Sequence, residues 1–115
     1  MHELSIALSI VEGVLEEAER RGARQIEAVY VRVGRLSGID KDALLFSYAI
    51  ACQDTPLAHT RLEIEDVEVV ILCSHCGAER ATQAFPLLTC ADCGSPAERV
   101  LHGDELEIRG FEVAA

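Results

Sequence analysis

Basic residues are scarce in this chain of 115 residues. It has 10 Lys and Arg against 20 Asp and Glu, so the formal net charge is −10. A surplus of negative charge repels phosphate backbones and anionic lipid headgroups. We therefore expect no nucleic-acid partner and no membrane partner, and cations or basic proteins are favoured instead.

Long apolar runs and export sequences are also missing. Crossing a bilayer takes about 20 consecutive apolar residues, and the longest apolar stretches, at 43–52 and 67–73, are shorter. The first residues lack the basic region, apolar block and cleavage site of a signal peptide. We expect a cytoplasmic protein, and in a reducing cytoplasm its five cysteines are better suited to bind metal than to form disulfides.

Motifs of common enzymes and nucleotide-binding proteins do not occur. Ser37 lies between Leu36 and Gly38 and not in a G-x-S-x-G sequence, so it is a turn residue and no nucleophile. The chain has neither G-x-G-x-x-G nor G-x-x-x-x-G-K-S/T. We expect no enzymatic activity, and any nucleotide-driven step must come from a partner.

Hydrophobic periodicity predicts a small α+β fold. Apolar residues recur every three or four positions from Leu4 to Arg21, which indicates an amphipathic helix ending before Gly22. Asp40 can cap a second helix that runs to about Gln53. Alternating stretches at 26–33, 61–71 and 105–113 predict strands. The order suggests two helices packed on one face of a small three-stranded sheet.

The buried faces of both helices follow from the same periodicity. In the first helix the repeating apolar residues are Leu4, Leu8, Val11 and Leu15, flanked by Ile6, Ala7, Ile10, Val14 and Ala18. In the second helix we expect the buried side to consist of Leu44, Leu45, Tyr48, Ile50 and Ala51. Cys52 is expected to be a small buried apolar residue beside them.

A segment of different character interrupts this pattern. Between about 71 and 98 the periodicity fades and Cys, Gly and Pro accumulate. We predict an inserted zinc-ribbon-like module at 71–98, and a discontinuous α/β domain made of 1–70 and 99–115.

Four cysteines of this module are spaced as metal ligands. Cys73 and Cys76, and Cys90 and Cys93, form two C-x2-C-G units with thirteen residues between them. Two intervening residues let both sulfurs of a unit face one point, and the following glycine accommodates a positive φ angle. Together the units predict a closed tetrathiolate site, which is typical of structural zinc.

Other interpretations of the four cysteines fit less well. Iron can occupy the same cage, and the colour of fresh protein distinguishes it from zinc. Two disulfides are disfavoured in a reducing compartment, and a thioredoxin-like pair needs a single C-x-x-C at the start of a helix. Residues 70–98 carry a net charge of −2, because Arg80 is opposed by Glu79, Asp92 and Glu98. Zinc bound by four thiolates adds −2, so this module is unsuited to nucleic acid.

The histidines are further metal-ligand candidates. In the second position of the chain, His2 can chelate Ni(II) or Cu(II) through the α-amine, its own amide nitrogen and its imidazole. The same residue also fits an ordinary solvated side chain. His75 and His102 are additional candidates for nickel binding or pH response, with a solvated surface role as the alternative. His59 is expected to face solvent.

Four motifs occur together in order along nearly the whole chain: MHELS at the start, VGRLSGI at 33–39, the paired C-x2-C-G units, and GDELEI at 103–108. Together they resemble the HypA/HybF family of hydrogenase nickel-incorporation proteins. The resemblance implies a nickel metallochaperone with nickel ligands at Met1, His2 and Glu3, and with structural zinc at the four cysteines. Ala91 replaces a proline that often follows this cysteine in the family, which loosens the turn without touching a ligand.

The resemblance also implies partners. These are a HypB-type GTPase and the large subunit of [NiFe]-hydrogenase, while urease remains an alternative recipient. We expect a monomer or a weak homodimer. Two other functions stay open: an adaptor whose zinc ribbon docks a partner while His2 has no role, and a metalloenzyme, which would need an open position on the zinc.

Overall fold

The computed structural model describes residues 3–82 and 88–114. The chain divides into two compact units. The first unit comprises Met1–Val31, Ile39–Glu65 and Glu107–Ala115, and the second unit comprises Arg32–Gly38 and Asp66–Leu106. The second unit therefore extends beyond the segment 71–98, and the domain boundaries drawn from the sequence stay a prediction.

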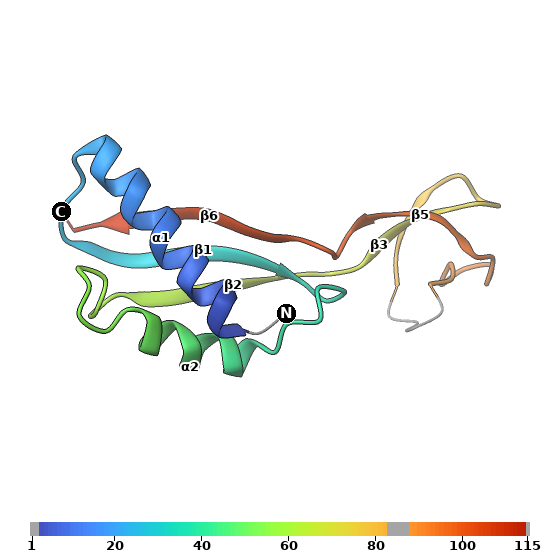
Figure 1. Cartoon of the computed structure of the whole chain (residues 1–115). Helices are drawn as coiled ribbons and strands as arrows, with labels where there is room; N and C mark the ends of the chain where they lie inside the picture. The colour runs from blue at the N-terminus through green and yellow to red at the C-terminus, as the bar shows by residue number, and fades with distance from the viewer. Residues whose placement is uncertain (1–2, 83–87, 115) are drawn as a thin grey trace. The chain divides into compact units, whose positions relative to one another are not determined.

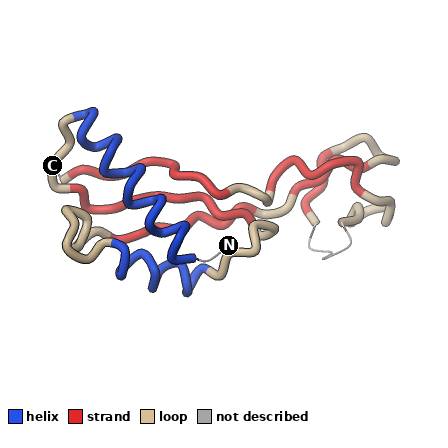
Figure 2. Tube along the Cα trace, in the orientation of Figure 1, coloured by secondary structure: helices blue, strands red, loops and turns tan. Residues whose placement is uncertain are grey.

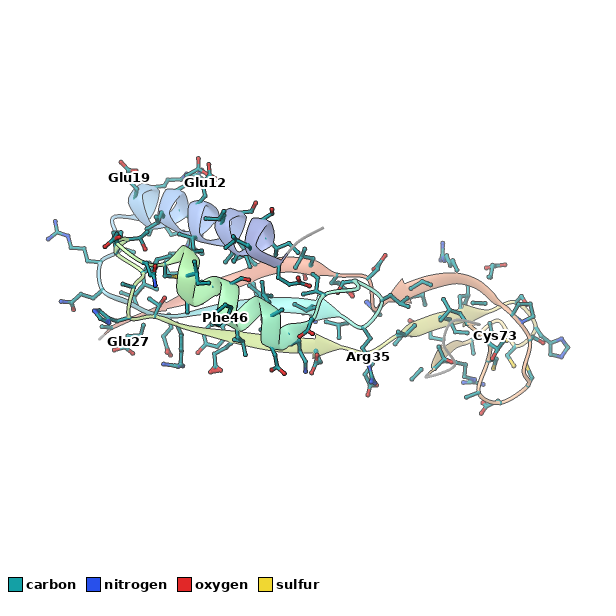
Figure 3. The ribbon with its side chains drawn as sticks, turned by 60° about the horizontal axis from the view of Figure 1, so that its bottom comes forward. Glu12, Glu19, Glu27, Arg35, Phe46 and Cys73 are labelled. Carbon is teal, nitrogen blue, oxygen red and sulfur yellow. The ribbon has the colours of Figure 1, made fainter. Side chains whose placement is uncertain are left out.

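Helix α1 (Glu3–Arg21) forms where the periodicity predicts it, and Gly22 follows with φ +64°. Its buried face is rotated from the expected one. Leu4 and Leu8 are 42% and 50% exposed, and the buried residues are Ile6, Ala7, Ile10, Val11, Val14 and Ala18. Glu12 and Glu19 point away from the core, as Figure 3 shows.

Helix α2 (Lys41–Ala51) begins at the predicted cap. Asp40 has an extended backbone, and its Oδ1 accepts a hydrogen bond from the amide of Ala43 at 3.1 Å. The prediction that Leu45 and Ile50 are buried was wrong, because the buried face consists of Leu44, Ser47, Tyr48 and Ala51. Phe46 is 71% exposed and is labelled in Figure 3.

The first sheet contains β2 (Arg61–Val67), β1 (Ile26–Gly34) and β6 (Leu106–Val113) in that order. Both helices cover one face of it, as Figures 1 and 2 show. Val29, Val31 and Val33 of the central strand are buried. The predicted arrangement of two helices on a three-stranded sheet is confirmed. No helix in the described ranges is long and apolar enough to cross a membrane.

The second sheet was not predicted as a sheet. It contains β4 (Glu79–Ala81), β3 (Val70–Cys73) and β5 (Ala97–His102) in that order, all antiparallel. The single strand predicted at 61–71 is in fact two strands, β2 and β3, interrupted at residues 68 and 69. The apolar pattern runs through this break, so it gives no indication of the change of sheet.

Two of the sequence motifs meet within the second unit. The amide of Gly34 donates to Glu105 O at 2.8 Å, and the amide of Leu36 donates to Gly103 O at 2.7 Å. A Cβ atom on Gly34 would lie 2.0 Å from Gly103 O. Glycine is therefore required here by the close approach of two backbone segments. The segments VGRLSGI (33–39) and GDELEI (103–108) are thus hydrogen-bonded to each other where their backbones cross.

Candidate metal centres

The two cysteine units fold in the same way. Cys73 N donates to Ala78 O and Cys90 N to Ser95 O, at 3.0 and 2.8 Å. Each glycine of a unit donates back to the first cysteine of that unit, and Gly77 and Gly94 have φ angles of +68° and +74°. The positive φ predicted for these glycines is confirmed. Each unit is a tight turn that presents two sulfurs on one side.

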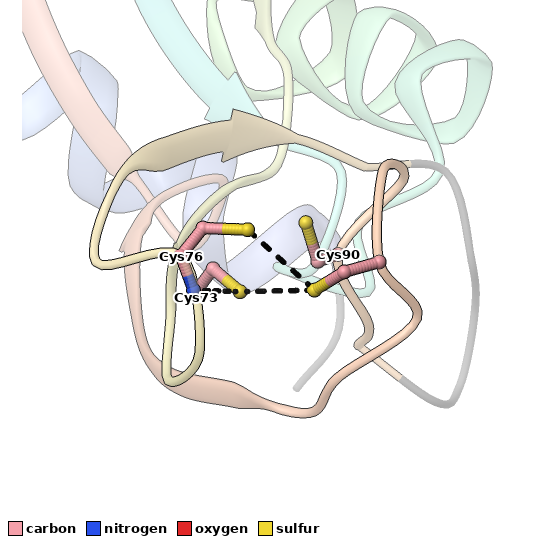
Figure 4. A group of neighbouring side chains, drawn as sticks. Cys73, Cys76 and Cys90 are labelled. Carbon is pink, nitrogen blue, oxygen red and sulfur yellow. Dashed lines mark hydrogen bonds between the residues drawn. The ribbon is translucent and has the colours of Figure 1, made fainter.

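The four sulfurs converge on one point. All four Sγ atoms lie within 4.8 Å of one another. Cys93 Sγ is 3.5 Å from Cys73 Sγ and 3.6 Å from Cys76 Sγ. Figure 4 draws the group with these contacts as dashed lines. Zn–S bonds of about 2.3 Å in a tetrahedron place sulfurs about 3.8 Å apart. The sulfur positions therefore fit a tetrahedral ion with little movement.

The thiols differ in acidity when no metal is bound. Hydrogen bonds from the hydroxyl and amide of Ser95 lower the pKa of Cys93 to about 6. Hydrogen bonds from the backbone of the second turn also lower the pKa of Cys90, with the amide of Cys93 contributing most. Interaction with the sulfur of Cys93, and then with Cys73, raises the pKa of Cys76 to about 12. As the pH rises, Cys90 and Cys93 of the second turn therefore lose their protons before Cys76 does. A cation that binds displaces the protons that remain.

This arrangement is suited to hold a metal and not to react with a substrate. Four soft thiolate ligands fill a tetrahedral ion completely, and zinc and iron are the ions that favour such a set. A bound ion would link the turn that follows β3 to the turn that precedes β5. Cys73 and Cys90 are buried, and Cys76 and Cys93 are exposed.

The second predicted site is described only in part. Met1 and His2 lie outside the described residues, and Glu3 is the first residue of α1. Glu3 Oε2 accepts a hydrogen bond from the backbone amide of Asp40 at 3.2 Å. This contact joins the start of α1 to the start of α2.

The other candidate ligands lie on the surface. His59 and His75 are exposed, as expected for solvated histidines. His102 Nδ1 is 3.3 Å from Glu105 Oε2, and Glu105 Oε1 accepts from the amide of Gly103 at 2.7 Å. No group of three or more ligands other than the four cysteines occurs in the part of the chain that the structure describes. Cys52 is 2% exposed, which confirms its prediction as a buried residue.

Two features were missed by the sequence analysis. The contact between Glu3 and Asp40 joins residues 37 positions apart, and local patterns carry no information about such a pair. Arg80 was noted only as a charge, but its Nε lies 2.9 Å from Asp92 Oδ2 beside the cysteines. The sequence held one indication of this contact, since Arg80 is the single basic residue of 70–98.

The fold and the four-cysteine site define a small α+β metal-binding protein. Residues 1–113 match the family described as "Hydrogenase/urease nickel incorporation, metallochaperone, hypA". The chain belongs to this HypA family of hydrogenase maturation factors and nickel metallochaperones, and the resemblance seen in the sequence motifs is confirmed.

Relatives match over the full length. A hydrogenase maturation factor HypA of Chloroflexus aggregans is 45% identical over 112 residues, which are 97% of this chain and 98% of the relative. The solution structure of the nickel metallochaperone HypA from Helicobacter pylori is 26% identical with a TM-score of 0.70, covering 100% of this chain and 99% of that chain. Another HypA solution structure is 25% identical with a TM-score of 0.73, covering 99% and 97%.

Proposed function

We propose that this protein binds Ni(II) at its amino terminus and delivers it to the large subunit of [NiFe]-hydrogenase during maturation. The observation that carries the proposal is membership of the nickel-incorporation family over residues 1–113, together with the residues MHE at the start of the chain. The protein acts as a carrier and not as an enzyme.

The proposed nickel ligands are Met1, His2 and Glu3. The α-amine of Met1, the amide and imidazole nitrogens of His2, and the backbone or a supporting contact of Glu3 provide nitrogen donors that suit a planar Ni(II) site. The carboxylate of Glu3 faces the amide of Asp40, so its side chain has a structural partner already. This favours a contribution of Glu3 through its backbone.

The four cysteines are proposed to hold zinc permanently. Their geometry fits a closed tetrahedral site. A filled coordination shell leaves no position for a substrate or a water, which argues against the metalloenzyme alternative. The zinc site is therefore distinct from the nickel site, because transported nickel has to be released and is bound at the amino terminus instead.

Partners follow from the family and from the chain's charge. Because the chain has no nucleotide-binding motif, we propose that a HypB-type GTPase supplies the energy-dependent step, with the hydrogenase large subunit as recipient and urease as the alternative. The charge of −10 disfavours nucleic acid and membrane surfaces. We propose a cytoplasmic location and a monomer or weak homodimer.

Metal analysis before and after nickel exposure tests the proposal. Untagged protein should contain one zinc and acquire one nickel, and His2→Ala should keep the zinc and lose the nickel. His59→Ala is the matched control, because it removes an exposed imidazole elsewhere in the first unit. Nickel binding unchanged by His2→Ala would move the nickel site away from the amino terminus. A wild-type protein that binds no nickel would favour the alternative function, a zinc-ribbon adaptor without a nickel role.

A further inference from the structure

A single basic side chain lies against the four-cysteine site. Arg80 is on β4, paired with Ile71 of β3, and Ile71 is two residues before Cys73. Arg80 is the only Lys or Arg between residues 70 and 98. Its charge is thus placed beside the one site of this segment where negative charge collects.

Arg80 forms an ion pair with the second cysteine turn. Its Nε is 2.9 Å from Oδ2 of Asp92, which lies between Cys90 and Cys93. The charge of Asp92 raises the pKa of Arg80 most, and a hydrogen bond with Cys90 and the charges of Cys76 and Cys90 raise it further. The guanidinium is therefore held to the second turn by an ion pair, and charge on both turns acts on it.

The burial of Nε adds a second observation. The whole Arg80 side chain is 36% exposed, but Nε is buried and has no hydrogen-bond acceptor among the described residues. The ion pair with Asp92 thus lacks the alignment of a hydrogen bond. A buried N–H without a well-aligned acceptor is unfavourable. Sulfurs that carry a full negative charge on a metal ion attract a cation and accept hydrogen bonds more strongly than neutral thiols, so a filled site strengthens the attraction between the guanidinium and the sulfurs.

Arginine suits this position for chemical reasons. Zinc with four thiolates carries a net charge of −2, and residues around metal ligands orient them and adjust their electron density. A guanidinium is always charged, and its five N–H donors form a rigid planar fork, whereas lysine offers one mobile point charge. A donor to sulfur draws electron density from the thiolate and reduces its tendency to leave the metal as a protonated thiol.

We propose that Arg80 is a positioning residue of the tetrathiolate site, which holds the second cysteine turn against the first and offsets part of the negative charge of the bound zinc. This inference rests on the proposed zinc site. Asp92 anchors Arg80 from the second turn. The Asp92 side of this ion pair is exposed, so the pair contributes little stability by itself, and the effect is expected on metal retention and not on the fold.

The test compares zinc release from full-length variants. Zinc transfer to a chromogenic chelator should be at least about 10-fold faster for Arg80→Gln, as for other residues that contact metal ligands, with Arg80→Lys intermediate. Arg99→Gln is the matched control, because Arg99 lies on β5 of the same sheet and its loss changes the net charge equally. Arg99→Gln should release zinc within about twofold of the wild-type rate.

A spectroscopic measurement separates tuning of the sulfurs from loosening of the fold. In the Co(II)-substituted protein, Arg80→Gln should move the sulfur-to-cobalt charge-transfer band to longer wavelength, because a thiolate without its donor is richer in electrons. Equal zinc-release rates for Arg80→Gln and Arg99→Gln, or an unshifted band, would overturn the role of Arg80. Absence of zinc from the wild-type protein would instead refute the zinc site itself.

Discussion

Replacing Gly34 by alanine should open the backbone crossing in the second unit. A Cβ atom at this position would lie 2.0 Å from Gly103 O, 2.2 Å from Gly103 C and 2.7 Å from Asp104 N. All three are backbone atoms, so no side-chain rotation relieves the overlap. The two segments must separate by an ångström or more before they reach ordinary contact distance.

Separation of this size breaks the two hydrogen bonds of the crossing. Gly34 N to Glu105 O is 2.8 Å and Leu36 N to Gly103 O is 2.7 Å. Each contributes about 1 kcal/mol, and more if a group is left buried without a partner. We therefore expect a loss of about 3 kcal/mol of local stability, which is a large part of a total of 5–15 kcal/mol.

Amide hydrogen exchange at Leu36 measures this loss directly. A loss of about 3 kcal/mol corresponds to exchange about 100-fold faster. Two control variants separate sterics from backbone conformation: Gly110→Ala, which meets nothing within 4 Å, and Gly38→Ala, which has open space at φ +75°. Gly110→Ala should be near neutral, and Gly38→Ala should lose about 1 kcal/mol. Protection of Leu36 in Gly34→Ala equal to that in Gly38→Ala would refute the close approach.

Further predictions concern the zinc site, pH and partner association. Cys73→Ala should abolish tight zinc binding and expose the segment 71–98 to protease while the helical circular dichroism remains; one retained zinc would contradict the tetrathiolate. Burial alone raises the pKa of Glu105, but hydrogen bonds from backbone amides, Gly103 first, and from His102 outweigh it and lower the pKa below 4.5. The free energy of unfolding in urea should therefore be about 1 kcal/mol higher for the wild-type protein than for Glu105→Gln above pH 4.5. This difference should vanish as the pH falls through the lowered pKa, and a difference unchanged at pH 3 would contradict the prediction. Association with the proposed HypB-type GTPase should slow as salt rises, and a salt-independent rate would exclude electrostatic steering.

Local features of the fold were predictable from the sequence. The cap at Asp40, the end of α1 before Gly22 and the positive φ angles of Gly77 and Gly94 depend on neighbouring residues, and all four were found. The turn of each C-x2-C-G unit also follows from local spacing, since its hydrogen bonds form within the turn itself. The pairing of β3 with β5 then brings the two turns together.

Features that depend on distant contacts were not predictable. The break between β2 and β3 adjoins Val69, which is fully buried and packs against Gly103. An apolar residue at 69 is as compatible with a continued strand as with a break. The contacts of Glu3 with Asp40 and of Arg80 with Asp92 likewise arise only after the chain has folded.

The most direct test of nickel binding at the amino terminus compares the native protein with a variant that has one additional residue before Met1. The proposed site needs the free α-amine and the amide of His2 in chelate register, and one added residue moves the imidazole out of that register while zinc content is unaffected. In calorimetric titration, the native protein should bind one nickel, more weakly as the pH falls because its nitrogen donors become protonated, and the extended variant should bind it far more weakly. Equal affinities would contradict the account and would move the site to His102 or His75.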